Sequence, residues 1–293
     1  TLCYELISLE RNLNHIAEII CEKIKAFKPV SGGDISKAFL LVTSHNRYFL
    51  KVNNHQEALV MFQAEKLGLE TIHNSNTIAV PQVFYCGTFE KQSLLLLEYI
   101  EPKSPEKKDF QKLGTKLASL HNISQTSFGF SSDNYIGRLF QSNKPHLNWE
   151  DFYCHERILP QLILAKTNGL LSNNEIPEIP SLLKALKDLS NNVTPSLLHG
   201  DLWSGNYIIA TDGTPYLIDP AIYFGHNEVD IAMSKLFGGF DQSFYQTYEE
   251  YYPIDENSRA RTDLYQLYYL LVHLNMFGNS YYGNVKGILS RYF

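Results

Sequence analysis

The sequence is poor in cysteine, in long apolar runs and in clustered positive charge. Its four cysteines, Cys3, Cys21, Cys86 and Cys154, form neither a C-x-x-C motif nor a His-paired metal motif. Scattered thiols of this kind indicate reduced structural cysteines, and a cytoplasmic location is expected. No apolar run approaches the roughly 20 residues of a membrane-spanning helix, so we expect no membrane partner. A net charge of -6 without a basic cluster argues against a nucleic-acid partner.

The composition favours a packed globular protein with two lobes. Apolar residues make up 44% of the chain and charged residues 19%, and the 19 tyrosines and 17 phenylalanines argue against disorder. A chain of 293 residues is long for a single core. Residues 1–98 carry nine basic and ten acidic side chains, so most of the negative excess lies in the rest of the chain. This weakly favours a cationic ligand for the second half.

The periodicity predicts a small antiparallel sheet followed by helices, which is an α+β fold. An amphipathic helix is expected over Glu5–Phe27, where apolar residues recur at spacings of three and four. A further helix is expected at about His55–Leu67. The strand-like segments are Lys37–Thr43, Tyr48–Val52, Pro81–Gly87 and Ser93–Glu98. A proline-containing stretch at 101–105 breaks all periodicity, so we divide the chain into a first lobe of residues 1–100 and a second of residues 101–293.

The second lobe is predicted to be mainly helical. Its expected helices are Glu106–Asn122, Trp149–Leu171, Pro180–Asn191, Glu228–Phe237, Gln242–Tyr251 and Arg259–Met276. Short strands are expected around Leu197, Ile208 and Leu217, and Asp212-Gly213 is a typical hairpin turn between the last two.

Three polar residues in this lobe have the spacing of a phosphoryl-transfer site. Asp201, Asn206 and Asp219 are separated by five and thirteen residues, within His-Gly-Asp-Leu-Trp-Ser-Gly-Asn and the later Leu-Ile-Asp-Pro. An Asp in such a loop can accept a hydroxyl proton, while the Asn and the second Asp can hold Mg2+ beside nucleotide phosphates. Each residue alone is equally typical of a helix cap or turn, but the set of three favours the catalytic interpretation.

A kinase site also needs a cation for the phosphates, and Lys51 at the end of a predicted strand is the candidate. Glu65, on the following helix, is the predicted partner of this lysine. Glu57 lies within about 80° of Glu65 around the helix and is the alternative. A solvent-facing lysine is the alternative role for Lys51.

Two backbone segments complete the predicted nucleotide site. Gly32, Gly33 and Asp34 lie between two expected strands, where backbone amides can cover phosphates, although a plain hairpin turn has the same signature. The connector between the lobes, Glu98, Tyr99, Ile100 and Glu101, can bond an adenine edge or be a strand leaving the sheet.

These motifs occur in the order seen in the fructosamine kinase (ketosamine 3-kinase) family, which the chain resembles within the aminoglycoside and choline kinase branch. The resemblance spans roughly residues 30–280 and includes the catalytic loop, Asp219-Pro220-Ala221, the run 223–233 and 265–268. It implies a bilobal protein-kinase-like fold, with a nucleotide-binding first lobe and a catalytic, substrate-binding second lobe. Because only ten residues separate Asp219 from Asp230, no long activation segment is expected.

The resemblance implies transfer of the ATP γ-phosphoryl group to the 3-hydroxyl of a ketoamine, free or protein-bound, which promotes deglycation. Asp201 is then the base, Asn206 and Asp219 hold Mg2+, and Lys51 binds the α- and β-phosphates. Asp34 stands where some members of the family carry cysteine, so a redox switch in that loop is not supported. A monomer is expected.

Other polar residues near the motif have structural or substrate-binding alternatives. Trp203 is predicted either to contact the sugar or amine or to anchor the loop in the core. Glu228 is predicted to attract a cationic amine. Asp230 is expected to be a buried acceptor for the catalytic-loop backbone, and His199 and His226 are expected to be structural. His273 is expected in the core or on the surface of the lobe.

Two other functions use the same residues. An aminoglycoside or choline-type kinase would place the same catalytic set against a different acceptor. A nucleotide-binding scaffold without activity is the alternative of another class, and the complete set of Lys51, Asp201, Asn206 and Asp219 argues against it.

Overall fold

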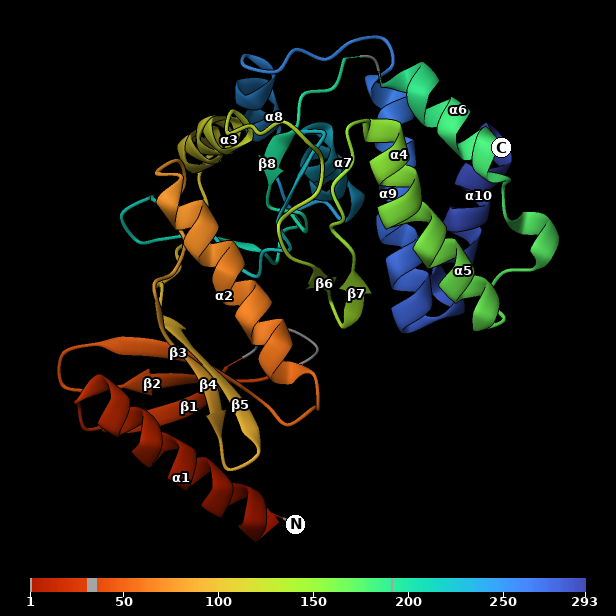
Figure 1. Cartoon of the computed structure of the whole chain (residues 1–293). Coiled ribbons are helices and arrows are strands. Elements are labelled where there is room, and N and C mark those ends of the chain that lie inside the picture. Colours follow the sequence, from red (N-terminus) through yellow and green to blue (C-terminus); the bar gives the residue numbers. More distant parts are fainter. Residues whose placement is uncertain (1, 31–35, 191) are drawn as a thin grey trace.

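The computed structural model describes residues 2–30, 36–190 and 192–293, and the side chains of residues 2–10 are outside this description. Figure 1 shows a sheet with the N-terminal helix at one end of the molecule and a larger group of helices at the other. The sheet-containing part comprises α1 (Leu2–Ile20), β1 (Ala26–Val30), β2 (Lys37–Val42), β3 (Arg47–Asn53), α2 (Ala58–Asn74), β4 (Val83–Phe89) and β5 (Gln92–Glu98).

The remaining described elements are mainly helices with short hairpins between them. They are α3 (Lys107–His121), β6 (Asn134–Ile136), β7 (Leu139–Gln141), α4 (Trp149–Tyr153), a π-helical turn (Cys154–Ile158), α5 (Leu159–Thr167), α6 (Ile179–Leu189), β8 (Ser196–Leu198), β9 (Tyr207–Ile209), β10 (Pro215–Leu217), β11 (Tyr223–Gly225), α7 (Glu228–Leu236), α8 (Gln242–Glu249), α9 (Ser258–Phe277) and α10 (Tyr282–Tyr292). Short 3-10 turns at Asn173–Glu175 and Asn279–Tyr281 complete the set. None of the described helices is long and apolar enough to cross a membrane.

The sheet is antiparallel with the order β1-β2-β3-β5-β4, and its two faces have different partners. Alternate residues of β3, including Leu50, face α1 and pack with Leu13 and Ile16. Because side chains alternate along a strand, Lys51 points to the opposite face, where α2 lies. Successive side chains of β3 therefore point to opposite faces of the sheet: Leu50 packs in the core with α1, and Lys51 faces α2.

The structure corrects the sequence prediction at the first strand. We expected a helix over Glu5–Phe27, but α1 ends at Ile20 and residues 26–30 form β1. This edge strand is largely exposed and contains Pro29, so it lacks the apolar alternation that identifies a half-buried strand. The hairpin between β2 and β3 is present as predicted.

The second part is built around α9, which is buried along most of its length. Its apolar side chains form one core with α4, α5, α6 and α7, and α3 and α8 belong to a second core that also contacts α2 and β5. Neither the β6–β7 hairpin nor α10 was predicted. The predicted hairpin around Asp212-Gly213 is confirmed as β9–β10.

We expect Ile16→Ala to destabilise the protein by about 2–5 kcal/mol, because Ile16 is fully buried between α1 and the sheet. An exposed position two residues earlier on α1 gives a control, and Asn14→Ala should change stability by no more than about 0.5 kcal/mol. Urea unfolding of both variants measures the difference. Equal effects at the two positions would contradict the packing of α1 on the sheet.

Candidate active site

The peptide groups preceding Asp201 are held by one buried carboxylate. Asp230, on α7, accepts hydrogen bonds from the backbone N–H of His199 at 2.7 Å and of Gly200 at 2.9 Å. The same carboxylate lies 3.0 Å from His121 Nε2, and its side chain is fully buried. Burial alone would raise the pKa of Asp230, but the hydrogen bond from His121 and the backbone bonds outweigh it and lower the pKa. The expected structural role of Asp230 is confirmed.

His199 also has a structural role, as expected. It is fully buried, and its Nε2 lies 2.8 Å from the carbonyl oxygen of Ile218. A carbonyl can only accept, so Nε2 carries the proton, and Nδ1 accepts the N–H of Asp201 at 3.2 Å. Burial lowers the pKa of His199, which favours this neutral form.

Asp201 and Asn206 lie in direct contact. The amide nitrogen of Asn206 donates to the backbone oxygen of Asp201 at 2.8 Å and to its Oδ2 at 3.2 Å. Burial, with the negative charge of Asp219, raises the pKa of Asp201 to about 7. Both bonds use the amide nitrogen of Asn206, which leaves its oxygen for a cation.

Lys51 links the two lobes. Its Nζ lies 2.8 Å from Glu65 Oε1 and also pairs with Asp219. The pairing with Glu65 rather than Glu57 is confirmed. Burial opposes the charge on Lys51, but the carboxylates of Asp219 and Glu65 outweigh it and raise the lysine pKa. Burial raises the pKa of Glu65, whereas the charge of Lys51 outweighs burial at Asp219 and lowers its pKa.

Asp219 has a backbone conformation that few residues adopt. Its φ angle is +52°, in the left-handed region. Such conformations are uncommon for residues other than glycine, although Asp tolerates them better than most, and they cluster at functional sites. The next residue, Pro220, packs against Gly68 of α2, where an added Cβ would lie 2.9 Å from the proline ring. This close approach places Asp219 beside α2, the helix that carries Glu65.

These side chains line one cavity of about 650 Å3. The predicted residues that line it are Lys51, Glu65, Asp201, Trp203, Asn206 and Asp219. Trp203 is 39% exposed rather than buried in the core, and its ring packs against Gly205, where an added Cβ would approach it to 2.4 Å. The cleft therefore brings together the predicted catalytic set and an accessible indole.

Other predicted residues lie elsewhere. Glu228 lines a different cavity, where Arg261 binds its carboxylate. The connector residues Glu98, Tyr99, Ile100 and Glu101 are not among those lining the cleft; the Tyr99 N–H bonds the Arg47 carbonyl at 3.4 Å and Glu101 pairs with the Arg47 side chain. The predictions for Gly32, Gly33 and Asp34 lie outside the described residues.

Sequence reasoning missed one wall of the cleft. This wall consists of β6 and its turn, with aromatic and apolar side chains of α7, α9 and the segment after it; they include Tyr135, Phe237, Tyr269, His273, Met276, Phe277 and Tyr281. We expected His273 in the core or on the lobe surface, but it lines the cleft, with Nδ1 bonded to the Tyr269 carbonyl. The available signal was the recurrence of aromatic residues at spacings of three and four in α9, but this pattern is equally typical of a helix buried in a core.

Comparison with known proteins identifies the family. The model of the family described as fructosamine kinase matches residues 10–293. The chain belongs to the fructosamine kinase family. A "Probable ketoamine kinase" of Lactiplantibacillus plantarum is 39% identical over 94% of this chain and 98% of its own length. "Protein-ribulosamine 3-kinase, chloroplastic" of Arabidopsis thaliana is 36% identical over 90% of this chain and 81% of its own.

Solved structures agree with this family and define the fold. A crystal structure named "Putative fructosamine-3-kinase", from Haemophilus somnus 129PT, has a TM-score of 0.86 and 30% identity, covering 96% of both chains. The choline kinase LicA of Streptococcus pneumoniae has a TM-score of 0.66 at 20% identity, covering 97% of this chain and 100% of its own. The fold is thus the bilobal kinase-like fold, and as a member of the fructosamine kinase family the protein is an ATP-dependent kinase.

Gly200→Ala should abolish most activity and destabilise the protein. Gly200 has a φ of +85°, and an added Cβ would lie 2.1 Å from the Ala221 carbonyl oxygen, which the backbone cannot accommodate. Gly169→Ala is a matched control because φ there is +71° with nothing within 4 Å of the Cβ. We expect the control to lose about 1 kcal/mol of stability through backbone strain alone and to keep its turnover. Thermal unfolding and steady-state kinetics measure both; equal losses would contradict the steric explanation.

The contribution of His226 to stability should become unfavourable when the pH is lowered from 7 to 5. Burial, with the positive charge of Arg261, lowers the pKa of His226 to about 3. The unfolded chain gains a proton near pH 6.5 that the folded state does not gain until about pH 3, so protons favour unfolding between these values. The cost for His226 at pH 5 is about 1–2 kcal/mol. Urea unfolding gives the stability at pH 5 minus that at pH 7, and this difference should be about 1–2 kcal/mol more positive for His226→Gln than for the unsubstituted protein. An equal difference in the two proteins would refute the assignment.

Proposed function

We propose that the protein transfers the γ-phosphoryl group of ATP to the 3-hydroxyl of a ketosamine, and so promotes deglycation of the amine. The observation that carries this proposal is the convergence of Lys51, Asp201, Asn206 and Asp219 on one cleft in a chain of the fructosamine kinase family. The names of the ketoamine and ribulosamine kinases that it resembles support the substrate class.

In this proposal Asp201 orients the acceptor hydroxyl and takes its proton as the oxygen attacks phosphorus. The bond from phosphorus to the β–γ bridging oxygen breaks, and ADP leaves with that electron pair. A carboxylate whose pKa is raised to about 7 is a better proton acceptor than an ordinary Asp. Lys51 binds phosphate oxygens, and Glu65 keeps the lysine aligned from α2. These groups act by positioning and charge neutralisation.

The polar groups of the cleft fit Mg2+. Among the described residues no group of three His, Cys, Asp or Glu side chains is arranged to hold a metal ion. Mg2+ commonly takes only one or two protein ligands, with phosphate and water for the rest. The carboxylate of Asp219 and the unused amide oxygen of Asn206 match that preference, and the Lys51 ammonium is the cation now paired with Asp219. When bound, the ion neutralises phosphate charge during transfer.

The aromatic wall supports a sugar with an attached amine as acceptor. Trp203, Phe237 and Phe277 are 39%, 41% and 48% exposed and all line the cleft. Exposed aromatic faces of this kind stack on sugar rings or alkyl chains, and an indole can contact a protonated amine. Carboxylates at Asp201 and Asp219 add negative potential for a cationic acceptor. This arrangement supports a substrate-binding role for Trp203.

We further propose that residues 1–100 act as the nucleotide-binding lobe and residues 101–293 as the catalytic lobe. Gly32, Gly33, Asp34 and the connector 98–101 are retained as the predicted ATP contacts in this proposal. The protein is proposed to act as a monomer in the cytoplasm. Size-exclusion chromatography with light scattering measures its oligomeric state. The thiols of Cys21, Cys86 and Cys154 are free, as reducing conditions require.

Release of ADP with a panel of acceptors tests the proposed function. We expect turnover with ribulosyl-lysine or fructosyl-lysine in the presence of MgATP, and little with choline or kanamycin. Turnover with choline or kanamycin alone would preserve the kinase chemistry but overturn the ketosamine assignment. All acceptors are compared at the same enzyme concentration. Turnover with any one of them shows an active kinase, and the acceptor that is used shows its specificity.

A pair of isosteric substitutions separates the proposed roles of the two aspartates. Asp201→Asn should reduce kcat by about 1,000-fold or more while MgATP affinity changes little, because it removes the base and keeps the metal ligands. Asp219→Asn, in which Asn tolerates the left-handed backbone, should instead weaken MgATP binding. Titration calorimetry with MgATP and steady-state kinetics measure the contrast. The same pattern for both variants would contradict separate roles.

A further inference from the structure

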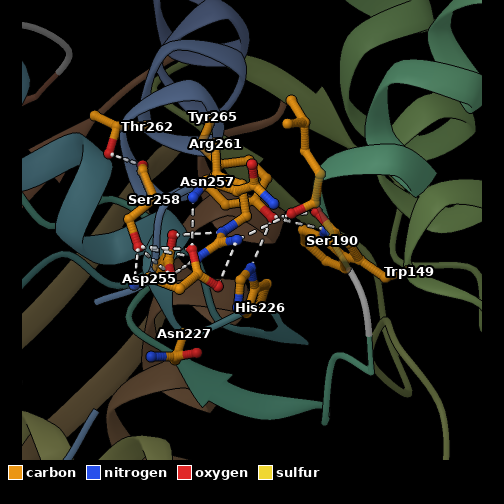
Figure 2. A network of polar contacts seen from close by, with 12 residues as sticks. Trp149, Ser190, His226, Asn227, Asp255, Asn257, Ser258, Arg261, Thr262 and Tyr265 are labelled. Carbon is orange, nitrogen blue, oxygen red and sulfur yellow. Dashed lines mark hydrogen bonds and ion pairs between the residues drawn. The ribbon is translucent and has the colours of Figure 1, made fainter. Parts of the chain in front are cut away.

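A buried ion pair holds the N-terminus of α7, on the side of the helix away from the catalytic loop. Arg261, on α9, is only 5% exposed, and its Nε and Nη2 bind the two oxygens of Glu228 at 2.8 and 2.5 Å. Nη1 donates to the Leu189 carbonyl at 2.9 Å, and Asp255 receives further bonds. Figure 2 shows Arg261 at the centre of this network, with Asp255 and Ser258 on one side and Ser190 and His226 nearby. The planar guanidinium therefore ties three segments together.

Helical geometry separates Glu228 from the cleft. Glu228 and Asp230 are two residues apart on α7, so their side chains leave the helix about 200° apart. Asp230 points to the catalytic loop, where it binds the N–H groups of His199 and Gly200. Glu228 lines the other cavity, of about 250 Å3, and both of its oxygens are bound to Arg261. Glu228 is therefore engaged with Arg261 in a cavity other than the catalytic cleft.

The two helices joined by this pair hold opposite sides of the catalytic loop. The α7 residue Asp230 accepts the Gly200 N–H at 2.9 Å, whereas the α9 residue Tyr269 donates its hydroxyl to the Gly200 carbonyl at 2.8 Å. Gly200 immediately precedes Asp201. A shift of α7 relative to α9 would therefore pull the N–H and the carbonyl of one residue in different directions and rotate the backbone that carries Asp201.

Only a few polar contacts set the relation between these helices among the described residues. Besides the ion pair, the Ser258 hydroxyl donates to Glu228 Oε1 at 3.3 Å and Gln266 donates to the Ala232 carbonyl at 2.9 Å. Arg261 lies eight residues, about 12 Å along the helix, from Tyr269. The ion pair joins the N-terminal ends of the two helices, and on α7 it lies two residues from Asp230, which holds the loop.

We infer that Arg261 and Glu228 are positioning residues for phosphoryl transfer, because their pair sets α7 against α9 and so orients the Gly200–Asp201 backbone. Neither residue is among those lining the cleft proposed for ATP and the acceptor. The inference rests on the proposed catalytic role of Asp201, and it replaces acceptor binding as the function of Glu228.

Steady-state kinetics of Glu228→Gln and Arg261→Lys test the inference with conservative changes. We expect kcat to fall by about 10- to 100-fold, as for a misplaced catalytic group, while KM for ATP and for the ketoamine stays within about twofold. The double variant should lose no more than the worse single variant, because the two residues act as one unit. Asp263→Asn provides the control: Asp263 is also on α9, but its partner Arg291, at 2.6 Å, lies on α10, and kcat should be unchanged.

A measurement without acceptor separates this inference from the proposed function. Hydrogen exchange of the peptide covering residues 196–206 should accelerate in Glu228→Gln and Arg261→Lys, but not in Asp263→Asn, whether or not a ketoamine is the substrate. Unchanged exchange together with unchanged kcat would overturn the inference. A raised KM for the ketoamine with normal kcat would also overturn it and would return Glu228 to acceptor binding.

Discussion

The catalytic machinery depends on the carboxylate of Asp230 being buried, ionised and fully bonded. A carboxylate in the interior is costly unless its oxygens accept hydrogen bonds, and here backbone N–H groups of His199 and Gly200 and the ring of His121 supply them. The loop depends on the carboxylate in turn, because the buried N–H groups of a tight loop also need a hydrogen-bond acceptor. The same hydrogen bonds therefore satisfy the buried charge and fix the loop before Asp201.

Around that loop, the cleft is assembled from segments that are distant in sequence. Strand alternation in β3 directs Lys51 away from the α1 core, and Glu65 meets it from α2. The left-handed backbone at Asp219 brings a carboxylate to the same cation, while Asn206 is held against Asp201. Positive charge from one lobe and negative charge from the other meet at the place where nucleotide phosphates are expected. This charge arrangement is suited to transfer chemistry that relies on positioning.

Short-range patterns predicted most of the catalytic set, and long-range packing explains what they missed. The spacing of Asp201, Asn206 and Asp219 is local, so it could be read directly; the roles proposed for these residues remain predictions. β1 was missed because it is an exposed edge strand with Pro29, and α10 because Gly283 and Gly287 lower its helix propensity. The β6–β7 hairpin has strands of three residues, too short for a periodic signal. The partner of Glu228 lies 33 positions away on another helix, which no local pattern reveals.

The position of the new phosphate on the product tests the central claim most directly. After reaction of the enzyme with ribulosyl-lysine and MgATP, two-dimensional phosphorus–proton NMR identifies the carbon that carries the phosphate. Our account predicts a correlation with the proton on carbon 3 and no other sugar proton at comparable intensity. A product phosphorylated at another hydroxyl, formed at a comparable rate, would contradict the proposed placement of the acceptor against Asp201.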